Sequence, residues 1–383
     1  MRFFWLVCQA MADDPLEALG GRTSMEVAKK PFMDKLVKEA RLSTASWIPP
    51  SLDAAGDVAA YSMLGYDPRE FYTGLAPLEA ASHHALKEDT SVAFRCDFVT
   101  VSEGELIDPR AGGITPEEAR VLTTELNKKI EKFHAKIVPV EGYKNLLFVE
   151  GANRTEELDD VETVSPERIR NEKIIKWAPK GKAGIFLRDL MEASKEVLEN
   201  HEVNRVRIDL KENPASMIWL WAQGKRPKLP PFGQRMGVGG VLWSKSDAWR
   251  GLALSAGLQV MKEWDEREFS DFNIAYWGSE DAEFSKDHRA KIRRIEEFDA
   301  KVVGPVMKSL KKSKDPARIL VTSDVLQSTA KGANTHAHAP VLWWGLGPGP
   351  VAAQTFSEKS CGQAATLYEP GHSVLQAFLK DQG

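Results

Sequence analysis

The sequence is poor in cysteine and has no long hydrophobic run. Its three cysteines, Cys8, Cys96 and Cys361, are far apart. Such a sparse, odd-numbered set predicts neither a disulfide framework nor a zinc site, and it favours a reducing cytoplasm. The apolar run at 3–8 is shorter than the roughly 7–15 residues of a signal-peptide core, so we expect a buried first strand there. No stretch approaches the ~20 apolar residues of a membrane helix, so we expect no membrane association.

Strong charge and familiar catalytic motifs are also lacking. The formal net charge is -4, which gives no basic surface for nucleic acid. The sequence contains no phosphate-binding P-loop, no spaced dinucleotide-binding glycines, no nucleophile elbow and no metal-binding histidine pair on a helix. What the 383 residues do offer is 43% hydrophobic content, enough for the core of one large domain or two ordinary ones.

Short apolar segments alternate with helical patterns. The expected strands are 3–8, 136–140, 145–149, 240–243, 273–277, 318–322 and 341–344. The expected helices are 34–42, 115–133, 188–200 and 287–312, the last interrupted at Gly304-Pro305. This alternation predicts an α/β fold with a mostly parallel sheet. Chemistry in such sheets lies at the carboxyl ends of strands, which here are Gln9, the loop after Trp277, Asp324 and Gly345.

Several long motifs occur in a fixed order along almost the whole chain. They are Met-Ala-Asp-Asp-Pro-Leu-Glu-Ala-Leu-Gly-Gly-Arg-Thr at 11–23, Leu-Gly-Tyr-Asp-Pro at 64–68, Tyr-Thr-Gly at 72–74, Pro-Leu-Glu-Ala at 77–80, Val-Ala-Phe-Arg-Cys-Asp-Phe-Val-Thr-Val at 92–101, Ile-Asp-Pro-Arg-Ala-Gly at 107–112, His-Glu-Val-Asn at 201–204, Ile-Trp-Leu-Trp at 218–221, and Val-Val-Gly-Pro at 302–305. With these motifs the chain resembles the archaeal-type 2,3-bisphosphoglycerate-independent phosphoglycerate mutases.

The resemblance implies an alkaline-phosphatase-like α/β fold with a smaller inserted α/β domain. We expect the core domain at 1–80 and 185–383, and an inserted phosphoglycerate-binding-like domain at 85–180. The family is an isomerase family of glycolysis, which interconverts 2- and 3-phosphoglycerate. It uses a serine nucleophile and two divalent metals (manganese, magnesium or zinc), which clamp the attacking and leaving oxygens.

The chain departs from the family at most of the positions that carry this chemistry. Gly56 stands where the family has its serine nucleophile. At the metal-ligand positions, Asp324 alone is unchanged, and the others are Gln9, Glu280, Phe284, Val325 and Asn334. A neutral amide or an apolar side chain is a poor ligand for a pair of hard cations. We therefore expect no metal cofactor.

Two groups of residues leave room for a rebuilt metal site. His336 and His338 are close to the lost ligand position 334, although a shift in register would aim their rings elsewhere. The acids at Glu280, Asp281, Glu283 and Asp287 are the donor type that hard cations take, yet such a charge run is more often a solvated helix entry. We favour the solvated interpretation for both groups.

The inserted domain retains more of the family pattern. The resemblance implies substrate binding by Arg95, Asp97, Arg110, Lys144 and Asn145, since arginine offers paired hydrogen bonds to carboxylate and phosphate. Asp97 replaces a family asparagine, and an added acid weakens anion binding.

We expect a catalytically inactive family member, a pseudoenzyme that binds a metabolite or a protein. Its partners would be a phosphoglycerate-like small anion, held weakly, and a protein partner or a second copy of the chain. The alternative is an active mutase, or a related metal-dependent phosphohydrolase, with a rebuilt site.

Overall fold

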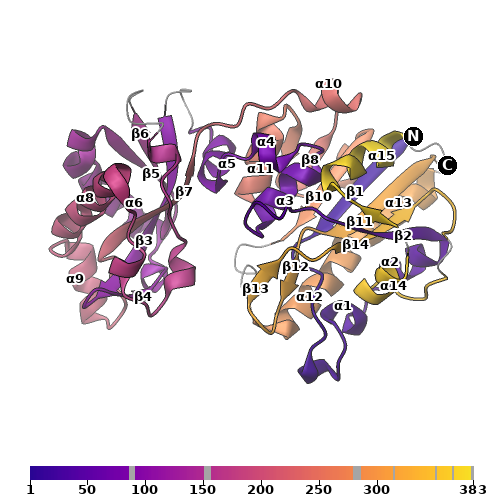
Figure 1. Ribbon diagram of the computed structural model, residues 1–383, viewed down its shortest axis with the longest axis horizontal. Coiled ribbons are helices and arrows are strands. Elements are labelled where there is room, and N and C mark those ends of the chain that lie inside the picture. Colours follow the sequence, from indigo (N-terminus) through magenta and orange to yellow (C-terminus); the bar gives the residue numbers. More distant parts are fainter. Residues whose placement is uncertain are drawn as a thin grey trace. The chain divides into compact units, whose positions relative to one another are not determined.

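The computed structural model describes residues 1–85, 91–150, 157–278, 286–313, 315–349, 352–364 and 366–380. The chain divides into two compact units. Unit 1 comprises Met1–Tyr72 and Lys228–Gly383, and unit 2 comprises Thr73–Pro227. Figure 1 shows the elements of both units.

Unit 1 is built on an eight-stranded sheet in the order β15-β2-β14-β11-β1-β10-β8-β9. All neighbouring pairs are parallel except those of β14 with β11 and β2. The strands are β1 (Arg2–Cys8), β2 (Ala40–Ala45), β8 (Val241–Ser244), β9 (Gln259–Met261), β10 (Phe272–Trp277), β11 (Ala317–Ser323), β14 (Ala339–Trp344) and β15 (Leu367–Tyr368). The expected α/β class with a mostly parallel sheet is confirmed.

Helices and a small hairpin surround this sheet (Figure 1). The helices are α1 (Ser24–Val27), α2 (Pro31–Leu36), α3 (Gly56–Met63), α4 (Pro68–Phe71), α10 (Phe232–Met236), α11 (Asp247–Ser255), α12 (His288–Phe298), α13 (Gly304–Ser313), α14 (Glu358–Gly362) and α15 (Val374–Lys380). The hairpin pairs β12 (Leu326–Ser328) with β13 (Ala333–Thr335).

The central strand β1 is buried on both faces. Phe4 belongs to the hydrophobic cluster that also contains Ile295 and Phe298 of α12. The neighbouring residue Trp5 faces the other way and makes edge contacts with Trp47 and Phe378. Because successive side chains of a strand alternate between faces, a run that is apolar at every position is covered on both sides.

Unit 2 is an antiparallel sheet with helices. Its five strands are β3 (Ser91–Ser102), β4 (Glu105–Asp108), β5 (Ala135–Glu141), β6 (Lys144–Glu150) and β7 (Met217–Gly224). Its helices are α5 (Leu75–Ser82), α6 (Pro116–Ile130), α8 (Gly181–Leu198) and α9 (Glu202–Asp209). The start predicted for α6 is confirmed: Thr115 accepts a hydrogen bond from the Glu118 backbone N–H, and the Glu118 carboxylate accepts one from the Thr115 backbone N–H.

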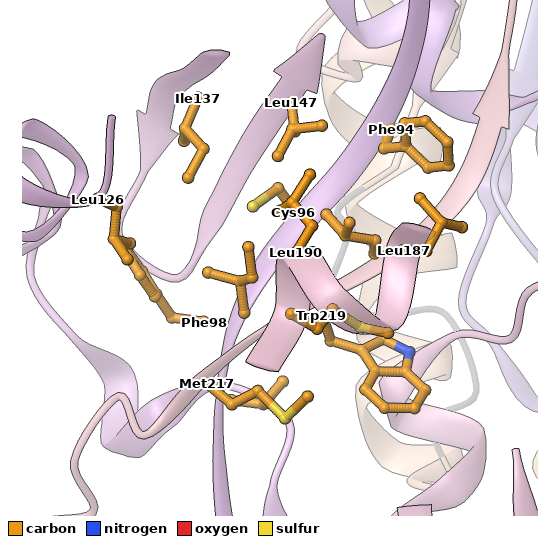
Figure 2. Packing of buried hydrophobic residues seen from close by; sticks show 14 of the residues in the cluster. Phe94, Cys96, Phe98, Leu126, Ile137, Leu147, Leu187, Leu190, Met217 and Trp219 are labelled. Atoms are coloured by element: carbon orange, nitrogen blue, oxygen red, sulfur yellow. The ribbon is translucent and has the colours of Figure 1, made fainter. Parts of the chain in front are cut away.

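The core of unit 2 lies between β3 and the helices α6 and α8. Figure 2 shows Phe94, Cys96 and Phe98 of β3 together with Leu187 and Leu190 of α8. All five side chains are at most 1% exposed. Spacing of two along β3 and of three along α8 puts these residues on one face of each element.

Unit 2 extends further than the expected inserted domain at 85–180. Strand β7 pairs with β3, and α8 packs on β7. Both elements therefore belong to the unit 2 sheet and core, and residues 185–227 are part of unit 2, not of the core domain to which the sequence analysis assigns them. Helix α5 also lies against β3 and β7, which moves the first boundary from 80 to 72.

Two local expectations are wrong. The predicted helix at 34–42 ends at Leu36, a short 3-10 turn follows, and Ala40–Ala45 is strand β2. Leu42 of β2 pairs with Leu342 of β14. A strand partner that is distant in sequence therefore overrides the local helical spacing. Strand β14 runs antiparallel to β11, and Gly345 therefore lies beside Ala317 at the opposite edge from Asp324.

The long helix expected at 287–312 is continuous but distorted. Helices α12 and α13 are joined by a π-helical segment at Asp299–Val303, so the irregularity comes just before Gly304-Pro305, where an interruption is expected. A π-bulge distorts a helix without ending it. No helix among the described residues is long and apolar enough to cross a membrane.

A buried polar network ties the segment after β1 to the rest of unit 1. The Asp13 carboxylate lies 3.1 Å from the Lys291 Nζ atom. It also accepts hydrogen bonds from the hydroxyl groups of Ser24 and Thr329, at 2.9 and 2.7 Å. These three contacts are to the Oδ2 atom, and the Oδ1 atom accepts the Thr329 backbone N–H at 2.9 Å. Both oxygens of this buried carboxylate therefore have donors, as burial of a charge requires.

Glu358, the first residue of α14, extends this network. Its carboxylate accepts hydrogen bonds from the Asp13 backbone N–H at 2.9 Å and from the Thr23 hydroxyl at 2.7 Å. Burial raises the pKa of Glu358 from 4.5 to about 7. The folded state therefore holds a proton on Glu358 in a pH range where the unfolded state does not.

We predict that Glu358 makes unit 1 less stable as pH rises. Because the pKa of Glu358 is raised in the folded state, its contribution to the free energy of unfolding is fully present below about pH 4.5 and is lost as the pH rises through about 7. The loss is about 3 kcal/mol at most. Glu358→Gln should match the wild type in urea unfolding at pH 4.5 and be more stable at pH 8. The exposed change Glu117→Gln is the control and should leave the pH profile unchanged. The prediction would be contradicted if the free energy of unfolding depended on pH in the same way in Glu358→Gln as in the wild type.

Candidate functional site

The ends of three neighbouring strands of unit 1 meet at the carboxyl group of Asp324. Its Oδ1 atom accepts hydrogen bonds from the backbone N–H of Ala10, after β1, at 2.6 Å and from that of Val325 at 2.8 Å. Its Oδ2 atom accepts the hydroxyl proton of Tyr276, from β10, at 2.9 Å. Asp324 is 1% exposed, and both its oxygens are hydrogen-bonded to protein groups.

Gly56 and Gln9 lie at the same edge of the sheet. Gly56 is the first residue of α3, and a Cβ atom added to it would lie 3.1 Å from the Asp324 Oδ2 atom. Gln9 lies against Gly278, where an added Cβ would be 2.5 Å from the Gln9 Oε1 atom. The structure thus brings together Gln9, Gly56 and Asp324. Glu280 and Phe284 lie outside the described residues.

Two acids at this edge, Asp324 and Asp57, have neutral hydrogen-bond donors. Burial raises the pKa of Asp324, while the hydrogen bonds from Ala10, Tyr276 and Val325 act in the opposite direction. Burial also raises the pKa of Asp57, which accepts a hydrogen bond from the Tyr72 hydroxyl at 2.7 Å. Hydroxyl and amide donors satisfy a carboxyl group without supplying the positive charge that a metal would.

The other described ligand positions supply no anionic or imidazole donor. Val325 is buried and apolar, and Asn334 lies on β13 opposite Gln327 of β12, with a neutral, buried amide oxygen that has no hydrogen-bond partner among the described residues. His336 is exposed and its Nε2 atom donates to the Leu52 carbonyl oxygen at 2.8 Å, if that nitrogen carries the proton. His338 is also exposed.

The described residues do not fit the two-metal centre that the resemblance implies. Within the described ranges, no group of three or more His, Cys, Asp or Glu side chains is placed to hold a metal ion. The retained Asp324 uses both oxygens on protein donors. Two divalent ions need several anionic or imidazole ligands.

Unit 2 holds a separate cluster of charged side chains around Arg95 of β3. One guanidinium nitrogen of Arg95 donates to the Glu79 carboxylate at 2.7 Å, and two others donate to Asp97 Oδ1 at 3.2 and 3.3 Å. Trp221 of β7 donates its indole N–H to Asp97 Oδ2 at 2.8 Å. Burial raises the pKa of Asp97, and the positive charge of Arg95 opposes that rise.

Tyr143 lies beside two other predicted substrate residues, one of which, Lys144, pairs with Asp97 across strands β6 and β3. The Arg110 guanidinium lies 5.6 Å from the centre of the Tyr143 ring, and the Lys144 ammonium lies 5.7 Å from it. Arg110 also pairs with Glu167 at 2.7 Å. Burial raises the pKa of Tyr143 to about 12 and lowers that of Lys144. The structure therefore gathers Arg95, Asp97, Arg110 and Lys144 in one region.

Asn145 lies next in β6 but is held differently. Its side-chain amide donates to the Tyr143 carbonyl oxygen at 3.1 Å. Its Oδ1 atom is buried and has no hydrogen-bond partner among the described residues. Asn145 pairs with Cys96, whereas Lys144 pairs with Asp97, so the two residues point to opposite faces of the sheet.

The sequence analysis missed four residues of these sites: Glu79, Tyr143, Trp221 and Tyr276. Trp221 stands opposite Arg95 in the β3–β7 pairing, and the alternation along 217–224 would have placed it there had that strand been recognised. No sequence signal would have indicated that the Tyr276 hydroxyl binds Asp324.

Comparison with known proteins identifies the family. The sequence model of 2,3-bisphosphoglycerate-independent phosphoglycerate mutase matches residues 38–204. The chain is 36% identical to the protein of that name from Methanothrix thermoacetophila over 400 aligned positions, covering 99% of this chain and 100% of the relative. It is 35% identical to the one from Methanosarcina barkeri, with 89% of each chain covered.

Solved structures agree on the fold. The PH0037 protein from Pyrococcus horikoshii is similar with a TM-score of 0.77 and 20% identity, covering 100% of this chain and 98% of the other. The chain belongs to the 2,3-bisphosphoglycerate-independent phosphoglycerate mutase family.

We predict that Tyr276→Phe destabilises unit 1. The change removes the hydroxyl donor to Asp324 Oδ2 and leaves a buried acceptor unpaired, which costs about 1–3 kcal/mol. Urea unfolding should show a lower midpoint with an unchanged slope. In a protein that already carries Asp324→Asn, Tyr276→Phe should lower the free energy of unfolding by less than it does in the wild type, because the carboxylate acceptor is no longer there. Full additivity of the two losses would contradict a direct interaction.

Proposed function

We propose that this chain is a non-catalytic member of the phosphoglycerate mutase family that binds a small anion weakly or binds a protein partner. The observation that carries the proposal is the surroundings of Asp324. The one metal-ligand position that is unchanged has its oxygens hydrogen-bonded by Ala10, Val325 and Tyr276.

The position of the family nucleophile supports the same proposal. Gly56 has no hydroxyl group to accept a phosphoryl group, so a covalent intermediate is closed at its first step. The nucleophile and the metal ligands act together in one catalytic step, so the effects of losing them are not additive. Restoring the serine alone therefore does not restore activity.

The proposed ligand would meet Arg95, Arg110 and Lys144 of unit 2, the cations of the cluster around Tyr143. Both arginines are paired with acids, which favours weak anion binding. The three buried cysteine thiols suit a reducing compartment, and we place the protein in the cytoplasm.

An active mutase, or a metal-dependent phosphohydrolase, is the second candidate. The relatives above carry the mutase name and cover 99% and 89% of this chain. Glu280, Asp281 and Glu283 follow β10 in the sequence and are the kind of oxygen donors that hard cations take. They lie outside the described residues, so a direct test must include them.

We predict that the purified protein does not interconvert 2- and 3-phosphoglycerate, with or without added manganese. A coupled assay of product formation checks this. Gly56→Ser alone should restore no turnover, because a serine there would meet Asp324 rather than a metal. Turnover that depends on manganese and disappears in Asp324→Ala, prepared in the same way to exclude a contaminating mutase, would overturn the proposal.

We predict further that the protein carries less than one equivalent of divalent metal per chain. Elemental analysis of the purified protein and calorimetric titration with manganese measure this. Asp324→Asn should leave the metal content unchanged. If the wild type holds stoichiometric metal that is lost in the triple variant Glu280→Gln, Asp281→Asn, Glu283→Gln, the second candidate function is correct.

A further inference from the structure

The guanidinium group of Arg95 is already occupied inside unit 2. It is 6% exposed, and it lies 2.7 Å from Glu79 and 3.2 Å from Asp97. The ring of Trp221 lies 5.2 Å from its central carbon. A buried arginine with two carboxylate partners and an aromatic partner offers little of its charge to a ligand.

Asp97 is held in place by more than Arg95. One of its oxygens accepts from Arg95 and the other accepts from the Trp221 indole N–H. Its side chain is 2% exposed. A carboxylate whose two oxygens take an arginine and a separate N–H donor makes the hydrogen bonds that a bound carboxylate ligand makes.

The described part of the cluster around Tyr143 has no excess of positive charge. Three cations, Arg95, Arg110 and Lys144, face the acids Glu79, Asp97, Glu141 and Glu167. A site that attracts anions needs an excess of positive charge or unpaired donors. Asp97 supplies one of the compensating charges, and it is the most deeply buried of the three acids that pair with the two arginines.

We propose that Asp97 is a built-in carboxylate ligand of Arg95, which takes the position of a small external carboxylate and keeps the anion affinity of unit 2 low. Truncating Asp97 would leave a space of the size of formate beside Arg95 and Trp221 and would remove one negative charge from the cluster. External formate would then fill the space and restore the lost ion pair. The inference concerns unit 2 and is independent of whether unit 1 catalyses a reaction.

The experiment is chemical rescue of Asp97→Ala. Loss of one partner of a buried ion pair should lower the melting temperature by about 10 °C. Sodium formate at roughly ten times its Kd should recover about 3–6 °C in Asp97→Ala. The wild type should gain no more from sodium formate than from sodium chloride at the same ionic strength. In calorimetric titration, 3-phosphoglycerate should bind Asp97→Ala at least about tenfold more tightly than the wild type.

The matched control is Glu167→Ala, which removes an acid from a more exposed arginine pair. The side chains of Arg110 and Glu167 are 40% and 34% exposed, so Glu167→Ala should lower the melting temperature only slightly. Formate should not raise the melting temperature of this variant more than that of the wild type. If Asp97→Ala does not fold, Asp97→Asn keeps the shape and removes the charge. It should then show the at least tenfold gain in affinity for 3-phosphoglycerate.

Two results would overturn the inference. One is equal affinity of the wild type and the Asp97 variants for 3-phosphoglycerate. The other is a formate-induced rise in melting temperature that is the same in the wild type and in Asp97→Ala. Neither result bears on mutase turnover, which is measured separately and decides the proposal for unit 1.

Discussion

The carboxyl group of Asp324 holds together the carboxyl edge of the unit 1 sheet. It accepts hydrogen bonds from Ala10 after β1, from Tyr276 of β10 and from Val325 after β11. These are the three central strands of the sheet, and α3 begins against the same carboxyl group. A fully buried acid is expensive unless each oxygen is satisfied, so the positions of Ala10, Tyr276 and Val325 are constrained together.

Much of the fold could be predicted from local pattern. Residues 3–8 are apolar at every position, which predicts that β1 is a central strand. Helix α6 begins where Thr115 and Glu118 form a capping box. Both signals lie within a few residues of the element that they define. The end of the expected helix at 34–42, the direction of β14 and the assignment of β7 to unit 2 could not be predicted in this way. Each depends on a strand partner far away in the sequence.

The candidate sites were predictable in position but not in bonding. The resemblance places Gln9, Gly56 and Asp324 at one edge of a sheet, and Arg95, Asp97, Arg110 and Lys144 in one region of the inserted unit. The bonds that decide what these residues do come from Tyr276 and Trp221, which look like ordinary core aromatics in the sequence. A buried hydroxyl or indole N–H is aimed by tertiary packing, and sequence spacing carries no record of that direction.

The two chain connections of unit 2 lie side by side. A Cβ atom added to Gly224, at the end of β7, would lie only 1.6 Å from the carbonyl oxygen of Thr73, so the first and last segments of the unit are in contact. None of the described residues between 73 and 227 contributes a strand to the unit 1 sheet. Unit 2 therefore has the topology of a cassette, and its sequence can diverge, be exchanged or be inserted elsewhere in evolution without breaking the hydrogen-bond ladder of the sheet that carries it.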